Sequence, residues 1–139
     1  MSDVTMKGYR PDGSSRTLMG PSTITANDVL KPVVIDTSAA NTVKLASDGE
    51  VITGIIDKME DLTSQAQGIV LTIAFRFGDE VTYTGELAVG DLVVADGNGG
   101  VRKVVTSGES ADTIPAGVTL PRVWEITDST NKKCVISLI

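Results

Sequence analysis

The residues that could do chemistry in this chain are carboxylates, one thiol and one indole, because the sequence contains no histidine. Two adjacent acid pairs stand out, Glu60-Asp61 and Asp79-Glu80. Neighbours along a strand point to opposite faces, so neither pair forms a general acid–base dyad by itself. We expect solvated loop charges at both places. A weak calcium site is the alternative if folding gathers the carboxylates.

Nucleophilic and phosphate-binding chemistry also lack support. A serine nucleophile needs a base, which is normally histidine. Cys134 is the only cysteine, so no intrachain disulfide forms, and its apolar neighbours Val135 and Ile136 predict a buried, unreactive thiol. The loop at 96–100 (DGNGG) lacks the GK[ST] ending and the following helix of a phosphate loop, and it fails as an EF-hand. We expect no enzyme activity and no cofactor or metal.

The single tryptophan marks a contact of another kind. Trp124 is expected to be a core or interface anchor, with a sugar-stacking platform as the alternative. The last strand, 133–139, is apolar on both faces, as expected of a strand covered on two sides. One face of this strand carries Val135, Ser137 and Ile139. Together with Trp124, these residues form the predicted subunit interface.

Composition and charge exclude several partner classes. The 12 Lys and Arg are scattered among 18 Asp and Glu, for a net charge of −6. Nucleic-acid binders usually carry a basic stripe, so no nucleic-acid partner is expected. No apolar stretch has the length that spans a bilayer, so no membrane partner is expected. The N-terminus does not resemble a signal peptide, and we expect synthesis in a cytoplasm.

The elements that position these residues are predicted to be strands, because the apolar content is mostly Val, Ile and Leu with few aromatics. Residues 71–77 (LTIAFRF) alternate, which predicts a strand with Leu71, Ile73, Phe75 and Phe77 on one buried face and a chain reversal at 78–80. Further strands are expected at 33–35, 41–45, 51–56, 81–84, 92–95, 101–105, 121–127 and 133–139. The strand at 71–77 is expected to form a hairpin with 81–84, 92–95 with 101–105 across a hairpin loop at 96–100, and 121–127 to pair with 133–139. A helical turn capped by Thr25 or Asn27 is expected between 24 and 30, and a loop or short helix at 58–67.

Residues 1–22 stand apart as a predicted extended arm. Glycines and prolines interrupt any regular element there, yet the segment carries apolar anchors. We expect it to become ordered against a partner, with an inert tail as the alternative. The predicted contact residues of the arm are Met6, Tyr9, Arg10, Arg16, Leu18 and Met19. Residues 23–139 are predicted to form a single compact β domain.

Short strands with turns every 8 to 12 residues predict an all-β fold, a small β-sandwich or barrel-like domain with at most one or two short helices. Three segments define the turns: 47–56 (SDGEVITGII), 85–94 (GELAVGDLVV) and 96–101 (DGNGGV). With the arm before them, they resemble the capsid decoration, or cement, proteins of tailed bacteriophages. The resemblance covers roughly residues 33–105.

The resemblance implies a virion structural protein without catalysis. Such proteins bind the outer surface of an icosahedral head, usually as homotrimers, and bridge major capsid subunits to stabilise the head. The major capsid protein is therefore the expected partner, and the outer capsid surface the expected location. Two alternatives stay open: another virion β protein of the tail or head-completion type, and a small ligand- or carbohydrate-binding β-sandwich.

Overall fold

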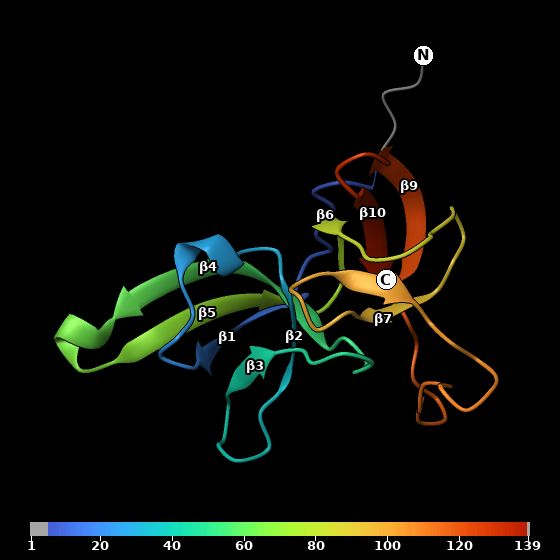
Figure 1. The fold of residues 1–139 in the computed structure, drawn as a ribbon. Helices are drawn as coiled ribbons and strands as arrows, with labels where there is room; N and C mark the ends of the chain where they lie inside the picture. The colour runs from blue at the N-terminus through green and yellow to red at the C-terminus, as the bar shows by residue number, and fades with distance from the viewer. Residues whose placement is uncertain (1–5, 139) are drawn as a thin grey trace.

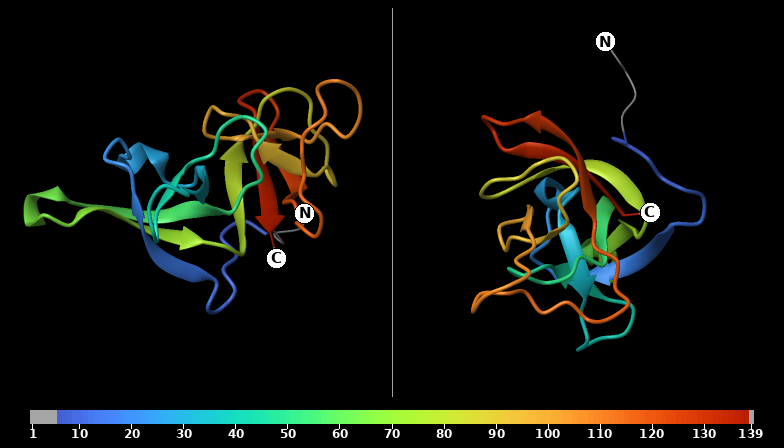
Figure 2. Two further views of the ribbon diagram at one scale, coloured as in Figure 1. Left: turned by 90° about the horizontal axis from the view of Figure 1, so that it is seen from below. Right: turned by 90° about the vertical axis from the view of Figure 1, so that its right-hand side faces the viewer.

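The computed structural model describes residues 6–138, which form an all-β domain with ten strands and two short 3-10 turns (Figure 1). The strands pair antiparallel within three sheets. The predicted fold class is confirmed at this level. The left view of Figure 2 shows the earlier and later strands gathered on different sides of the molecule.

The elements in chain order are β1 (Ser15–Gly20), η1 (Ala26–Asp28), β2 (Pro32–Ile35), β3 (Val43–Leu45), β4 (Gly54–Leu62), η2 (Thr63–Gln65), β5 (Gly68–Ala74), β6 (Phe77–Thr82), β7 (Val93–Ala95), β8 (Val101–Lys103), β9 (Arg122–Asp128) and β10 (Lys133–Leu138).

The first sheet has the order β1-β5-β4-β2-β3, and its two edges meet. A parallel bridge joins Met19 of β1 to Thr42, the residue before β3, and the Met19 amide donates to the Asn41 carbonyl at 2.8 Å. The sheet therefore curls around a core of its own. This core contains Ile24, Val33, Val43, Ile56, Ile69, Leu71 and Ile73.

The second half of the chain supplies a three-stranded sheet, β6-β10-β9, and the hairpin β7-β8. These elements surround a second core that includes Phe77, Val93 and Ile136. Strand β4 belongs to both cores, because Ile55 is buried in the second and its neighbour Ile56 in the first. Because successive side chains of a strand point to opposite faces, β4 contributes side chains to both cores.

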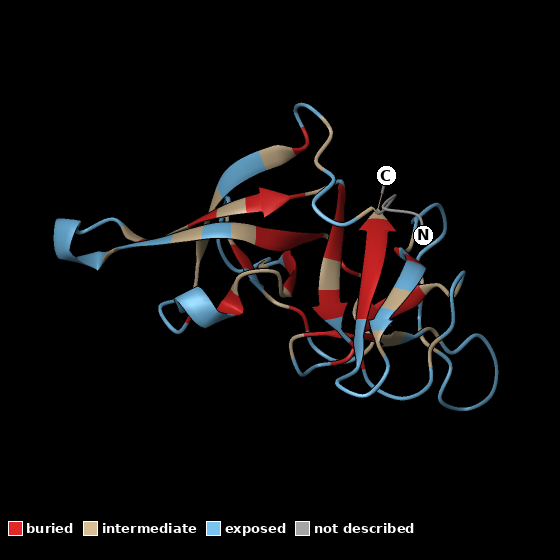
Figure 3. Cartoon of the chain, turned by 90° about the horizontal axis from the view of Figure 1, so that it is seen from above, coloured by how far each residue is buried: buried red, intermediate tan, exposed pale blue. Residues whose placement is uncertain are grey.

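The β4–β5 hairpin projects from the body of the molecule, and its tip is exposed (Figures 1 and 3). The strand expected at 51–56 begins only at Gly54 and continues to Leu62, so the prediction of a loop or short helix at 58–67 was wrong over 58–62. It is confirmed over 63–67, which contains the short helix η2. Polar residues such as Lys58 and Glu60 misled the prediction, because an exposed hairpin needs no apolar face.

The chain reversal after β5 was also misplaced. Phe75 and Arg76 turn the chain, whereas Gly78 and Asp79 lie inside β6. Strands β5 and β6 do not pair with each other and belong to different sheets. Consequently Phe77 packs in the second core, while Phe75 packs against the first.

Other local predictions are confirmed. The hairpin around 96–100 forms, and the Asp96 carboxylate accepts hydrogen bonds from the Asn98 and Gly100 amides. The strands β9 and β10 pair as expected. The short turn η1 starts from Thr25, which forms a capping box with Asp28.

Candidate functional site

Two surfaces of the molecule collect the residues predicted to make contacts. The first is the docked segment, which we define as residues 6–10 lying against the edge of β6. The second is the Trp124 groove, which β9, β10 and the loop before β9 line. Neither surface has the arrangement of a catalytic centre.

The docked segment is held to β6 through the backbone. The Gly8 amide donates to the Gly78 carbonyl at 2.7 Å, and the Gly78 amide donates to the Tyr9 carbonyl at 3.0 Å. Gly78 has to be glycine, since a Cβ there would collide with the Met6 carbonyl oxygen. The segment therefore acts as a very short extra strand beside β6.

Charges hold the same segment. Arg10 lies between Asp57 of β4 and Asp79 of β6, with its Nη2 3.2 Å from Asp57 Oδ1 and in ion-pair contact with Asp79 Oδ2. Lys7 Nζ lies 3.7 Å from Glu80 Oε2. Arg10 consequently joins the two main sheets, because its two carboxylate partners come from one sheet each.

Asp79 corrects the expectation of solvated loop charges, since it is buried within a strand. Burial raises the pKa of Asp79 above its ordinary value, and the Arg10 guanidinium opposes that shift. The other acid pair, Glu60-Asp61, is exposed near the tip of the β4–β5 hairpin. The alternation of β6 accounts for the difference, because Asp79 shares the inward face with Phe77 and Val81.

The remaining predicted arm residues lie in or beside β1. Leu18 packs against the first core, and Met19 pairs with Val70 of β5. Arg16 is exposed, and its Nη1 donates to the carbonyls of Gly13 and Ser15. Residues 15–20 of the predicted arm thus form part of the first sheet, which leaves residues 6–14 and 21–22 as its described portions outside a strand.

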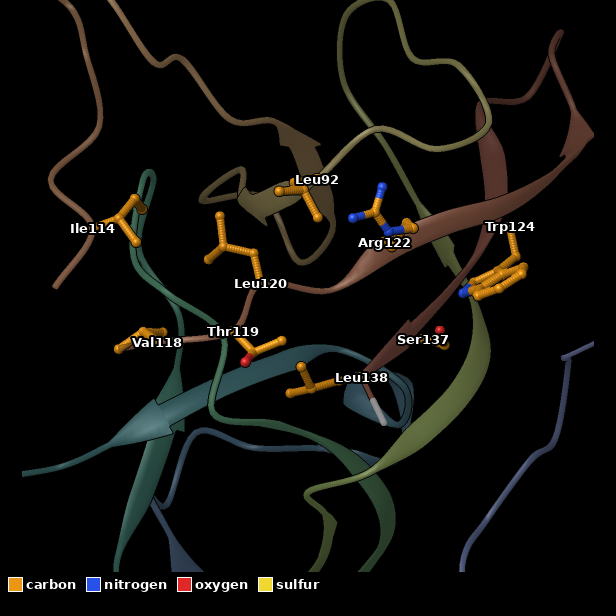
Figure 4. Close-up of a pocket in the computed structure, with 9 residues that line it drawn as sticks. All are labelled: Leu92, Ile114, Val118, Thr119, Leu120, Arg122, Trp124, Ser137 and Leu138. Carbon is orange, nitrogen blue, oxygen red and sulfur yellow. The ribbon is translucent and has the colours of Figure 1, made fainter. Parts of the chain in front are cut away.

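The Trp124 groove is an open depression of about 430 Å³. Figure 4 shows its lining: Leu92, Ile114, Val118, Thr119, Leu120, Arg122, Trp124, Ser137 and Leu138. Trp124 is 49% exposed and Val118 40%, which is high for large apolar side chains. A contact surface for another protein fits this combination of exposed apolar side chains with one arginine.

The groove brings together two of the predicted interface residues, Trp124 and Ser137. Val135 has no exposed surface and Ser137 only 4% within the single chain, so Trp124 is the one of these three that offers substantial area. Trp124 sits at a register shift between β9 and β10, where a bulge re-aims the side chain. The fourth predicted interface residue, Ile139, lies outside the described residues.

Sequence reasoning missed the loop residues of the groove and the partners of Arg10. The signal for the groove was the connection of 18 residues between β8 and β9, 104–121, since long loops without regular structure are usually functional. Ile114, Val118 and Leu120 are its apolar members. No local signal identified Asp57, because it meets Arg10 only through the packing of two sheets.

The candidate nucleophiles in the sequence are the Cys134 thiol and a serine paired with a lysine. Burial raises the pKa of the Cys134 thiol to about 12, with the Glu80 charge adding to the effect, so the thiolate nucleophile is suppressed. Ser129 and Lys132 have SxxK spacing, but they lie in the exposed β9–β10 turn. There Lys132 donates to the Gly85 carbonyl and lies 5.4 Å from the centre of the Tyr83 ring.

Within residues 6–138, no three His, Cys, Asp or Glu side chains lie close enough together to hold a metal ion. Over the same residues, no helix has the length and apolar character to cross a membrane.

In comparisons with known proteins, no family model matches the chain, and no curated protein matches its sequence.

Proposed function

We propose that this chain is a virion structural protein, a capsid decoration protein that binds the outside of a phage head and bridges its major capsid subunits. The observation that carries the proposal is the Trp124 groove, an exposed apolar surface on a small all-β domain. A protein that works through contacts needs such a surface, and no acid–base pair accompanies it. The proposal therefore includes the absence of enzyme activity.

The turn motifs that carry the family resemblance support this proposal. Gly49 follows Asp48 in a turn and has positive φ, as does Gly90 before Asp91. The Asp91 carboxylate accepts from the Ala88 amide at 2.9 Å, which closes the turn before β7. These turns build a compact body from which the β4–β5 hairpin projects (Figure 1).

The proposed assembly is a homotrimer in which the Trp124 groove lies between subunits. A half-exposed tryptophan beside aliphatic side chains is typical of the few residues that dominate an interface. Three copies that bind one head together gain avidity, so each capsid contact can be weak.

The test is light scattering on a size-exclusion column over a range of concentrations, followed by rebinding to undecorated heads. A trimer that binds expanded heads and raises their resistance to heat supports the proposal. Rings or filaments would favour a tail component. A monomer whose melting temperature rises with a sugar, and which does not bind heads, would contradict the proposal and favour the carbohydrate-binding alternative.

A further inference from the structure

The docked segment and its receptor carry opposite charges, and residues 6–10 supply all the contacts on the side of the segment. The segment supplies Lys7 and Arg10, and the receptor supplies Glu80, Asp79 and Asp57. Backbone bonds to Gly78 set the register between them. The receptor is thus the edge of β6 with its two carboxylates, together with Asp57 of β4 in the other sheet, and it accepts an extended basic segment.

The segment covers one end of this edge of β6, where Gly78 bonds to it. The other end is covered by β8, because a parallel bridge joins Tyr83 to Val101 and a Cβ at Gly100 would collide with the Thr82 carbonyl oxygen. If the segment leaves, the edge is therefore exposed at Gly78 and Glu80. The other side of β6 pairs along its full length with β10. An open sheet edge is a template for a strand from another chain unless something covers it.

A short turn separates the docked segment from the anchored part of the chain. In this turn the Ser14 amide and hydroxyl both approach the Pro11 carbonyl, and Gly13 has a φ of +72°. Directly afterwards the Phe75 amide donates to the Ser14 carbonyl, and β1 begins. Changes of dihedral angle at residues 11–13 alone would swing the segment away while the sheet stays intact.

From these contacts we propose that the β6 edge with Asp57, Asp79 and Glu80 is a docking site for residues 6–10 of a second copy of the chain, so that copies exchange this segment. A second copy carries the same Lys7 and Arg10, so every contact made within one chain is reproduced between chains. Exchange of an identical element is a low-cost route to association. This inference rests on the self-association in the proposed function.

The experiment uses unmodified protein. Equal amounts of unlabelled and 15N-labelled protein are mixed at several concentrations and treated with a carbodiimide, which couples an amine directly to a carboxylate. The Lys7–Glu80 pair, 3.7 Å apart, is the target, and mass spectrometry reads the isotopes of the linked peptides. If all contacts are exchanged, about half of these links carry mixed isotopes.

The expected result is a fraction of mixed-isotope links that rises with protein concentration. Links of one isotope only, at every concentration, would overturn the inference, whether the protein is an oligomer or a monomer. Binding to undecorated heads is measured separately, so head binding without mixed links would reject the exchange and leave the proposed function standing.

Two variants sharpen the result. Arg10→Gln removes the charge that reaches Asp57 and Asp79, and it is expected to lower the yield of Lys7–Glu80 links several-fold. The matched control is Arg16→Gln, because Arg16 is exposed and donates only to carbonyls of its own neighbourhood. Equal losses in both variants would contradict the role of the carboxylates.

Discussion

The docked segment and the Trp124 groove use the same three-stranded sheet in opposite ways. The segment covers one end of the β6 edge with backbone bonds and ion pairs, although the buried Arg10 Nε makes no hydrogen bond within residues 6–138. The groove opens over β9 and β10, where Trp124 and Val118 stay exposed. The difference shows that a sheet edge can be satisfied locally by a few residues. An exposed apolar surface such as the groove is where we propose that a second molecule binds.

The largest change in the free energy of unfolding is expected when a side chain is added at Gly78. Gly78→Ala places a Cβ against the Met6 carbonyl, so the docked segment must leave β6 and Arg10 must leave its carboxylates. We expect a loss of about 3 kcal/mol in the free energy of unfolding, because overpacking and broken ion pairs add. Urea denaturation measures it, with Thr127→Ala on exposed β9 as control.

If Gly78→Ala changes the unfolding free energy no more than the control does, residues 6–10 contribute nothing to the fold. Amide hydrogen exchange at Gly8 and Tyr9, whose amides both donate to the Gly78 carbonyl, separates that case from a repacked segment. An expelled segment loses its protection, and a repacked one keeps it.

Truncation of the tryptophan tests the opposite surface. Trp124→Ala is expected to weaken self-association by about 2 kcal/mol, since interface tryptophans are frequent hot spots. The stability of the single chain should change much less, because half of the side chain is already in water. Sedimentation velocity gives the first quantity and denaturation of dilute protein the second. A drop in stability without a drop in association would assign Trp124 to the core.

Loss of one arginine sharpens the contrast within the docked segment. Arg10→Gln leaves the buried Asp79 without its charged partner, and we expect a loss of about 1–2 kcal/mol in unfolding free energy. Arg16→Gln is expected to change it by less than about 0.5 kcal/mol. The comparison fails if the two variants are equally stable.

The smallest effect is a pH dependence of opposite sign in two places. Burial raises the pKa of Asp79 above its ordinary value, so its contribution to the free energy of unfolding is present where Asp79 is protonated and is lost as the pH rises through the raised pKa. Urea denaturation over a range of pH should show this dependence for the unaltered protein, and Asp79→Asn should abolish it.

Elsewhere the sign is reversed. Hydrogen bonds from Arg102 lower the pKa of Asp112, and hydrogen bonds with Lys31 and Thr25 lower that of Asp28. Their stabilisation is present above the unfolded pKa of about 4 and is lost as the pH falls through the lower folded values. Asp112→Asn and Asp28→Asn should therefore make the free energy of unfolding less sensitive to acid, whereas Asp79→Asn removes a contribution of the opposite sign. The same change of pH profile in all three variants would contradict this separation.

The sequence predicted what depends on local chemistry. The turn at 96–100, the capped turn at Thr25 and the pairing of β9 with β10 follow from glycine, capping and alternation. It failed where partners distant in sequence decide the outcome. The extension of β4 to Leu62 depends on pairing with β5, and the burial of Asp79 depends on an arginine 69 positions earlier.

The same limit applies to the candidate site. Trp124 was identified as a contact residue because of its type, and Arg10 because of its charge. Which side chains surround them was set by the packing of two sheets and by a long loop. No pattern within a short window contains that information.

The two consecutive isoleucines of β4 have a consequence for folding. Ile55 and Ile56 point into different cores, so a slip of β4 by one residue would spoil both cores at once. The register of this strand is therefore fixed from two sides. If either core unfolds, the β4 side chains that pack in the other core are exposed as well. We therefore expect the whole chain to unfold in a single cooperative transition.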